Sequence, residues 1–203
     1  MNKEALLTYW KISGLVKSKR VLDALAKVPR GNFVLEKYRE FAYLDEPLPL
    51  LAGQTISQPT TVAIMTDSLN VKPGQKVLEV GTGSGYQAAI LAELVGPSGK
   101  VFTVERIKAL VQFAKKNLKR YKNVKVIYAD GTKGYTKAAP YDRIIVTACA
   151  AQLPDILFAQ LKERGIMIIP IEDKMYRITK IMGKPKFEDL GWFVFVPLLS
   201  GTE

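Results

Sequence analysis

The sequence predicts an α/β fold with a doubly wound, mostly parallel sheet of seven strands, an antiparallel C-terminal hairpin and an N-terminal helical extension. From residue 76 onward, short apolar runs alternate with helical segments of about 10 to 15 residues, which is typical of βαβ units. A glycine-rich turn follows the first of these runs, and the last two runs flank a Gly-Lys-Pro turn. Together these features predict a Rossmann-like fold.

The length of 203 residues fits a single domain that covers residues 1–203. An apolar fraction of 48% with 24% charged residues is typical of a globular protein and excludes disorder as the main state. The sequence has no uncharged apolar run of about 18 residues, and its N-terminus carries charge where a signal peptide needs an apolar core. We therefore expect a cytoplasmic protein that has no membrane partner.

The N-terminal part reads as helices followed by a long loop. Residues 6–28 show helical spacing in two pieces around Gly14, and Pro29-Arg30-Gly31 ends the second piece. Residues 32–59 are rich in proline, glycine and aromatic residues and are expected to form a loop, which at this length is usually functional. Helical spacing resumes over residues 61–69.

The remaining chain supplies the predicted sheet and its helices. The expected strands are residues 76–80, 101–104, 124–128, 143–147, 166–171, 176–182 and 187–197. The expected helices between them are residues 85–95, 107–118 and 154–161. Residues 130–141 are expected to form a loop, and the last two strands to be joined by the turn Gly183-Lys184-Pro185.

The chain has no histidine and one cysteine, Cys149, which we expect to be a packed small residue. This composition excludes Ser-His-Asp and Cys-His relays and the usual nitrogen and sulfur ligands of zinc, so no metal is expected. The net charge of +11 fits attraction to acidic substrates or polyanions. Because no motif that reads nucleic acid accompanies this charge, a solvated lysine-rich surface is the favoured interpretation.

The turn after the first strand of the core predicts a nucleoside site. Gly81, Gly83 and Gly85 stand between residues 76–80 and the following helix, where glycine lets backbone N–H groups approach a ligand. The spacing is G-x-G-x-G, and Tyr86 stands where the dinucleotide fingerprint needs its third glycine. The turn therefore argues against NAD and favours another nucleoside ligand.

Two carboxylates follow the next two strands. Glu105 can accept hydrogen bonds from both hydroxyls of an adenosine ribose, although it could instead be an acid favoured at a helix N-terminus. Asp130 could accept the exocyclic amine of adenine, or it could belong to an ordinary Asp-Gly turn. With the glycine turn, the two residues describe an adenosine site at three successive strand ends.

These residues resemble the first motifs of class I S-adenosylmethionine-dependent methyltransferases. Over almost its whole length the chain is similar to one family of this class, the protein-L-isoaspartate O-methyltransferases. The most specific shared segments are GQTISQP at residues 53–59 and VGTGSGYQ at residues 80–87. Others are Val28-Pro29-Arg30, Asp45-Glu46-Pro47-Leu48, Val104-Glu105-Arg106, Asp130-Gly131, Ile145-Val146-Thr147-Ala148 and Phe195-Val196-Pro197-Leu198.

The resemblance implies transfer of a methyl group from S-adenosylmethionine to the free α-carboxylate of L-isoaspartyl residues in damaged proteins and peptides, leaving S-adenosylhomocysteine. The ester then forms a succinimide without the enzyme, which initiates repair. Residues 1–70 would hold the helices and substrate loop, and residues 71–203 the cofactor-binding core. The expected enzyme is a monomer that does not bind nucleic acid.

The resemblance also assigns roles to single residues. Ser57 is the expected catalytic residue. Substrate contacts are expected from Thr55, Ile56, Ser57 and Val196. Cofactor contacts are expected from Gln54, Thr55, Ser57, Glu79, Gly81, Thr82, Gly83, Gly85, Glu105, Arg106, Asp130, Gly131 and Thr147.

This reaction suits a chain without histidine. A carboxylate with a pKa of about 4 is already a nucleophile at pH 7, and a sulfonium is already an activated leaving group, so no general base is needed. Catalysis then consists mainly of positioning and desolvating the carboxylate.

The chain also departs from the family pattern. Thr60-Thr61 stands where many relatives carry a histidine or aromatic residue and a methionine. The extended C-terminal tail of some relatives is absent, so we expect any lid contacts to come from elsewhere.

Two alternatives remain. A methyltransferase that acts on RNA would suit the charge, but the chain has no Asn-Pro-Pro-Tyr or Asp-Pro-Pro-Tyr motif. A cofactor-binding module without transfer activity is disfavoured by the intact glycine turn, Glu105 and Ser57.

Overall fold

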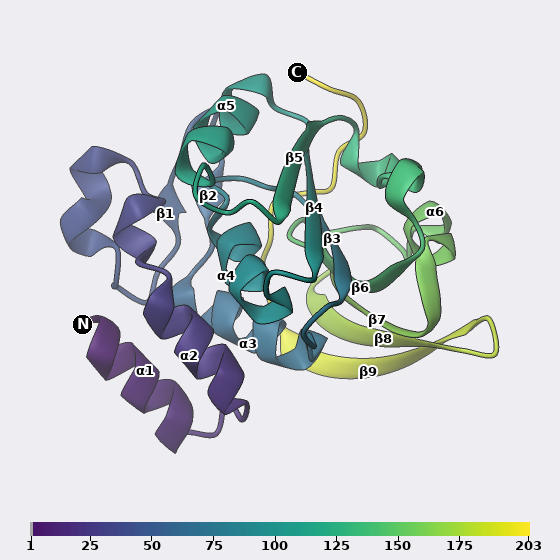
Figure 1. Cartoon of the computed structure of the whole chain (residues 1–203), viewed down its shortest axis with the longest axis horizontal. Coiled ribbons are helices and arrows are strands. Elements are labelled where there is room, and N and C mark those ends of the chain that lie inside the picture. Colours follow the sequence, from purple (N-terminus) through teal and green to yellow (C-terminus); the bar gives the residue numbers. More distant parts are fainter. Residues whose placement is uncertain (1) are drawn as a thin grey trace.

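A seven-stranded sheet with the order β5-β4-β3-β6-β7-β8-β9 forms the centre of the computed structural model, which describes residues 2–203 (Figure 1). The five strands from β5 through β4, β3 and β6 to β7 pair in parallel. Strands β8 and β9 are antiparallel to their neighbours. The predicted fold class is confirmed. The strands are β3 (Lys76–Val80), β4 (Lys100–Glu105), β5 (Val124–Tyr128), β6 (Tyr141–Val146), β7 (Leu161–Ile171), β8 (Lys174–Ile181) and β9 (Lys184–Trp192).

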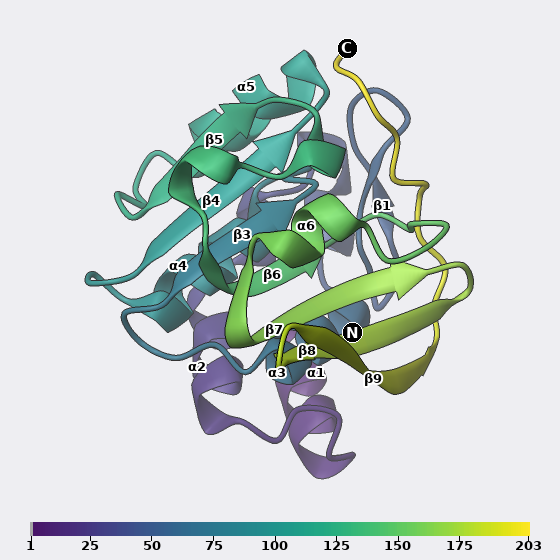
Figure 2. The ribbon, with the colours of Figure 1, turned by 90° about the vertical axis from the view of Figure 1, so that its right-hand side faces the viewer.

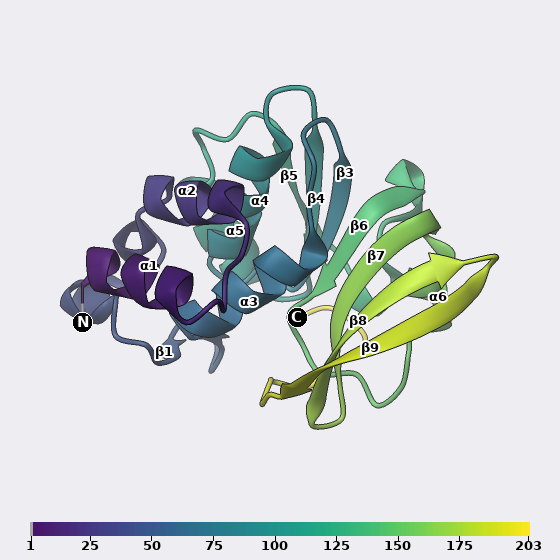
Figure 3. The ribbon, with the colours of Figure 1, turned by 90° about the horizontal axis from the view of Figure 1, so that it is seen from below.

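Helices cover both faces of this sheet, because its strands carry apolar side chains on both sides. In β3, Val77 belongs to the larger apolar cluster, under helices α1 to α5, and Leu78 to the smaller cluster, under α6. Figure 3 shows the two groups of helices on opposite sides of the sheet. The helices are α1 (Lys3–Ile12), α2 (Lys19–Lys27), α3 (Pro59–Leu69), α4 (Tyr86–Val95), α5 (Lys108–Asn117) and α6 (Asp155–Ala159).

Local signals in the sequence set the first two helices. The Asn2 side chain caps α1 by accepting a hydrogen bond from the N–H of Ala5 (2.8 Å), and Ser18 caps α2. Gly14 lies between them with a positive φ of 72°. The two predicted helical pieces are confirmed.

The segment predicted as a loop, residues 32–59, contains regular structure. Glu36–Phe41 is a 3₁₀ helix, and β1 (Leu48–Pro49) pairs antiparallel with β2 (Thr55–Ile56). This short pairing aligns Leu48 with Ile56 and holds the residues that precede Ser57.

Three predictions in the second half are wrong in their boundaries. Strand β7 begins at Leu161, because Leu161 pairs with Tyr141 ahead of an irregularity at which Arg164 has a φ of 61°. Helix α6 is correspondingly shorter than predicted. The hairpin turn is Met182-Gly183, where both residues have positive φ, so Lys184 and Pro185 belong to β9.

The last predicted strand, residues 187–197, is also wrong beyond Trp192. Gly191 has a φ of 103°, and Phe193 and Phe195 pack against the larger apolar cluster instead of extending the hairpin. The chain then crosses to the end of β6, where the N–H of Cys149 donates to the carbonyl oxygen of Val196 (2.7 Å). Figure 2 shows this yellow segment leaving β9.

Within residues 2–203, each helix is too short or too polar to cross a lipid bilayer.

The buried position of Leu78 gives a test of the core. Leu78 is fully buried at the centre of the sheet, so Leu78→Ala should lower the free energy of unfolding by about 2–5 kcal/mol. Ile12→Ala, at a side chain that is 81% exposed, should change it by less than about 0.5 kcal/mol. Denaturant unfolding measures both, and equal losses would contradict this core.

Candidate active site

A cavity of about 780 Å³ opens at the carboxyl ends of β3, β4 and β6, the edge at which parallel sheets bind ligands. One wall is the turn after β3 and the residues that follow β4 and β6. The segment before α3 and the chain after β9 supply the rest of the lining. The lining includes Gln54–Gln58, Glu79–Ser84, Val104–Ile107, Gly131, Thr147–Ala148 and Trp192–Leu199.

The turn after β3 depends on glycine. Gly81 has a φ of 93°, and a Cβ atom there would collide with the Thr147 side chain. The Gly81 N–H donates to the carbonyl oxygen of Val104 (2.9 Å), and the Thr147 hydroxyl donates to the carbonyl oxygen of Gly81 (2.8 Å). The turn is thereby joined to both neighbouring strands, and it leads directly into the N-terminus of α4, which favours anionic or polar ligand groups.

The Glu105 carboxylate joins the end of β4 to this turn. One oxygen accepts the N–H of Gly83 (2.9 Å), and the other accepts the N–H groups of Arg106 (2.8 Å) and Ile107 (3.0 Å). A carboxylate has about four acceptor positions, so one remains for a ligand hydroxyl. Glu105 therefore organises the start of the segment after β4 and also lines the cavity, and its contact with a ribose stays a prediction.

Glu79 is an unpaired buried carboxyl group in the cavity lining. Among residues 2–203, neither of its side-chain oxygens has a hydrogen-bond partner, and the residue is fully buried. The pKa of Glu79 is raised to about 8, mainly by burial and also by the charge of Glu105, while the neighbouring Thr103 hydroxyl, which is paired with that of Thr82, opposes the rise. A buried carboxylate is costly unless a cation or a donor meets it, so Glu79 fits a ligand that presents an ammonium group.

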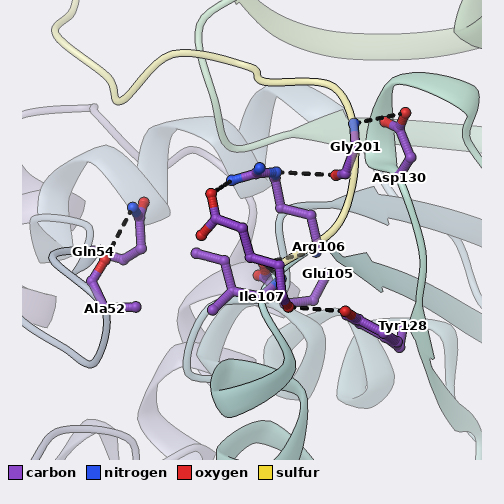
Figure 4. Close-up of polar contacts among 9 residues, drawn as sticks. Ala52, Gln54, Glu105, Arg106, Ile107, Tyr128, Asp130 and Gly201 are labelled. Atoms are coloured by element: carbon purple, nitrogen blue, oxygen red, sulfur yellow. Dashed lines mark hydrogen bonds and ion pairs between the residues drawn. The ribbon is translucent and has the colours of Figure 1, made fainter.

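Asp130 is bound by the protein itself. One of its carboxylate oxygens accepts the N–H and hydroxyl of Thr132 (2.9 and 2.6 Å), and the other accepts the N–H of Gly201 (2.9 Å; Figure 4). Burial would raise its pKa, but these hydrogen bonds outweigh burial and lower it. Asp130 lies beside the cavity rather than in its lining, and a contact with adenine stays a prediction.

The last residues of the chain fasten the rim on the same side. Arg106 forms an ion pair with Glu203 (2.8 Å) and donates to the carbonyl oxygen of Gly201 (3.1 Å), and the Tyr128 hydroxyl donates to the carbonyl oxygen of Glu203 (2.8 Å; Figure 4). These contacts join the last residues of the chain to the ends of β4 and β5, and the source of any lid contact stays a prediction.

The segment before α3 carries most of the predicted substrate residues. Ile56 is buried and Ser57 half-buried just before α3, and the Gln54 side chain turns back to the carbonyl oxygen of Ala52 (3.5 Å; Figure 4). Val196 lines the cavity from the segment after β9. The structure thus brings all the predicted site residues into the lining of one cavity except Gly85 and Asp130.

Sequence reasoning missed the apolar rim. Trp192, Val194 and Leu199 line the cavity and are largely exposed. Their spacing suggested a continuing strand, because a run of apolar residues has the same pattern in a strand and in an extended segment at a cavity mouth.

The family model described as protein-L-isoaspartate(D-aspartate) O-methyltransferase matches residues 1–203. The chain belongs to this family. It is 49% identical over 205 residues to the protein-L-isoaspartate O-methyltransferase of Ignicoccus hospitalis, covering 98% of this chain and 97% of that one. It is 54% identical over 188 residues to that of Methanothrix thermoacetophila, covering 90% and 89%.

A solved structure of the same family has the same fold. The protein is assigned as the protein-L-isoaspartate O-methyltransferase of Plasmodium falciparum and was crystallised with S-adenosyl-L-homocysteine. It superposes with a TM-score of 0.87 at 32% identity and covers 98% of this chain and 99% of its own.

Ligand binding should release a proton from Glu79. With a pKa of about 8, the free carboxyl is mostly protonated near neutral pH, and an ammonium group favours its ionised form. We expect S-adenosylhomocysteine to release close to one proton on binding at about pH 6.5, where its own amine is charged. Calorimetric titrations in two buffers of different ionisation enthalpy measure this release.

The Glu79→Gln variant is the control for this prediction and should abolish the release. The free protein gives a second signal: because folding raises the pKa of Glu79 from 4.5 to about 8, its contribution to stability is complete below pH 4.5 and is lost as pH rises through 8. Glu79→Gln should remove that decline. A release of the same size from the variant would contradict the assignment.

Proposed function

We propose that this protein transfers the methyl group of S-adenosylmethionine to the free α-carboxylate of L-isoaspartyl residues in proteins and peptides. The observation that carries the proposal is that the glycine turn and the Thr55-Ile56-Ser57 segment line one cavity, in a chain that matches the family over residues 1–203. The family match does not favour RNA methylation or a non-catalytic module.

The cofactor side of the cavity fits S-adenosylmethionine. This molecule supplies a methyl group that is activated by a positively charged sulfur. Its ammonium group matches the unpaired Glu79 carboxyl, and its ribose hydroxyls match the free acceptor position of Glu105. Gly81 and Gly83 line the same cavity between these two residues in the chain, and a side chain at Gly81 would collide with Thr147.

The substrate side needs only to hold and partly desolvate a carboxylate. An isoaspartyl α-carboxylate is ionised at neutral pH, so no residue has to remove a proton. In our proposal the Ser57 hydroxyl donates a hydrogen bond to it, while Ile56 and Val196 provide apolar flanks. This hydrogen bond orients the carboxylate. It must stay moderate, because negative charge leaves the acceptor during transfer.

We further propose that the enzyme works as a cytoplasmic monomer and that nucleic acid is not its substrate. The description of the family that matches residues 1–203 names a protein substrate, which supports the second part of this proposal.

Two synthetic peptides that differ only in L-isoaspartyl against L-aspartyl at one position test the reaction. Incubation with methyl-labelled S-adenosylmethionine should give a base-labile ester on the isoaspartyl peptide alone, because only there is a free α-carboxylate next to a backbone that continues through the side chain. Transfer to neither peptide, or equally to both, would contradict the proposal.

Ser57→Ala should separate positioning from cofactor binding. Losing the orienting hydroxyl is expected to lower kcat by about 10- to 100-fold. The dissociation constant for S-adenosylhomocysteine should change much less, because Glu79 and Glu105 remain. Ser13→Ala, at the end of α1 away from the cavity, is the matched control. Unchanged turnover in Ser57→Ala would remove Ser57 from the mechanism.

A further inference from the structure

Helix α3 begins directly after Ser57, and its N-terminus is capped from a distance. The N-cap residue Gln58 makes no capping hydrogen bond within the described chain, and Pro59 has no N–H. The Asp45 carboxylate supplies the cap instead, by accepting the N–H of Thr60 (2.9 Å). A negative charge at this position is also favoured by the helix dipole.

The Thr60 hydroxyl ties this cap to a third element. It donates to the second oxygen of Asp45 (2.7 Å) and accepts from the indole N–H of Trp10 (2.8 Å), which is buried in α1. Because the hydroxyl donates one hydrogen bond and accepts another, its orientation is fixed. Helix α1, the segment before β1 and the start of α3 are therefore joined at a single threonine.

Arg30 contacts the residues that precede Asp45 in the chain. Its buried guanidinium donates through Nε to the carbonyl oxygen of Ala42 (2.8 Å), and its backbone N–H donates to the Tyr43 hydroxyl (3.2 Å). The guanidinium carbon lies 5.2 Å from the ring centre of Tyr86, which lines the cavity at the start of α4. Arg30 thus links the segment before Asp45 to helix α4, the helix that follows the glycine turn.

From these contacts we infer that Asp45, acting through Thr60, is a positioning residue for methyl transfer. The backbone around Ser57 is held on one side by the pairing of Thr55 with Pro49 and on the other by the Asp45 cap. Removing the Asp45 cap frees the backbone that follows Ser57, while the glycine turn and Glu105 keep their contacts. A misplacement of about 1 Å at a reacting group costs about 100-fold in rate. The inference rests on the proposed function.

Asp67 provides a matched control on the same helix. Near the other end of α3, its carboxylate accepts the N–H groups of Lys17 (3.1 Å) and Ser18 (3.0 Å), so it joins two elements by the same chemistry away from the cavity. Asp45→Ala removes the cap and Thr60→Val removes the hydroxyl that ties it to Trp10, whereas Asp67→Ala removes the comparable contact. The comparison uses the melting temperature, the dissociation constant for S-adenosylhomocysteine, and kcat and KM for an isoaspartyl peptide.

Asp45→Ala and Thr60→Val should lower kcat by about 10- to 100-fold. Their melting temperatures and cofactor affinities should stay close to those of Asp67→Ala, which should keep its turnover. A fall in kcat no larger than that of Asp67→Ala would overturn the inference. So would a loss of cofactor binding that accounts for the whole fall.

Hydrogen exchange of the complex with S-adenosylhomocysteine gives a readout that does not depend on activity. The amides of residues 55–58 should exchange at least about tenfold faster in Asp45→Ala than in Asp67→Ala, because only the first variant frees this backbone. Equal exchange would overturn the inference. If the unaltered enzyme fails to methylate the isoaspartyl peptide, the proposed function fails, and the exchange comparison still decides whether Asp45 positions the segment.

Discussion

The turn between β3 and α4 is the constraint on which the rest of the site depends. Because β3 lies between β4 and β6, its exit meets the ends of both neighbours, and Gly81 and Gly83 bond to groups on each of them. A side chain on Gly81 would displace Thr147, so the position requires glycine. The turn brings Glu79 and Glu105 to one cavity, one carboxyl group without a partner and one largely satisfied by the chain.

The second wall is built by long-range contacts rather than by local signals. The β1–β2 pairing precedes Ser57 in the chain and the Asp45–Thr60 contact follows it. A reaction whose acceptor is already ionised and whose methyl group is already activated needs no proton relay, which agrees with a chain that has no histidine. What the fold must supply is a fixed distance between Ser57 and the cofactor bound at the glycine turn.

Much of this architecture could be predicted from the sequence, because the alternation of apolar strands and helices and the glycine turn are local patterns. The path of residues 193–203 could not, since the same apolar alternation fits a strand and a cavity rim. The bonds of Asp130 to Gly201 and of Thr60 to Asp45 join residues far apart in the chain. Thr60 looked like a departure from the family pattern, and only its contacts with Asp45 and Trp10 show what its hydroxyl does.

The central claim is that the two walls hold cofactor and carboxylate face to face. A crystal structure of the enzyme with S-adenosylhomocysteine and an isoaspartyl peptide tests it most directly. The ligand's ammonium group should contact Glu79. The peptide's α-carboxylate should accept a hydrogen bond from Ser57 and face the ligand's sulfur. A carboxylate bound away from Ser57, or an ammonium group paired with another acid, would contradict it.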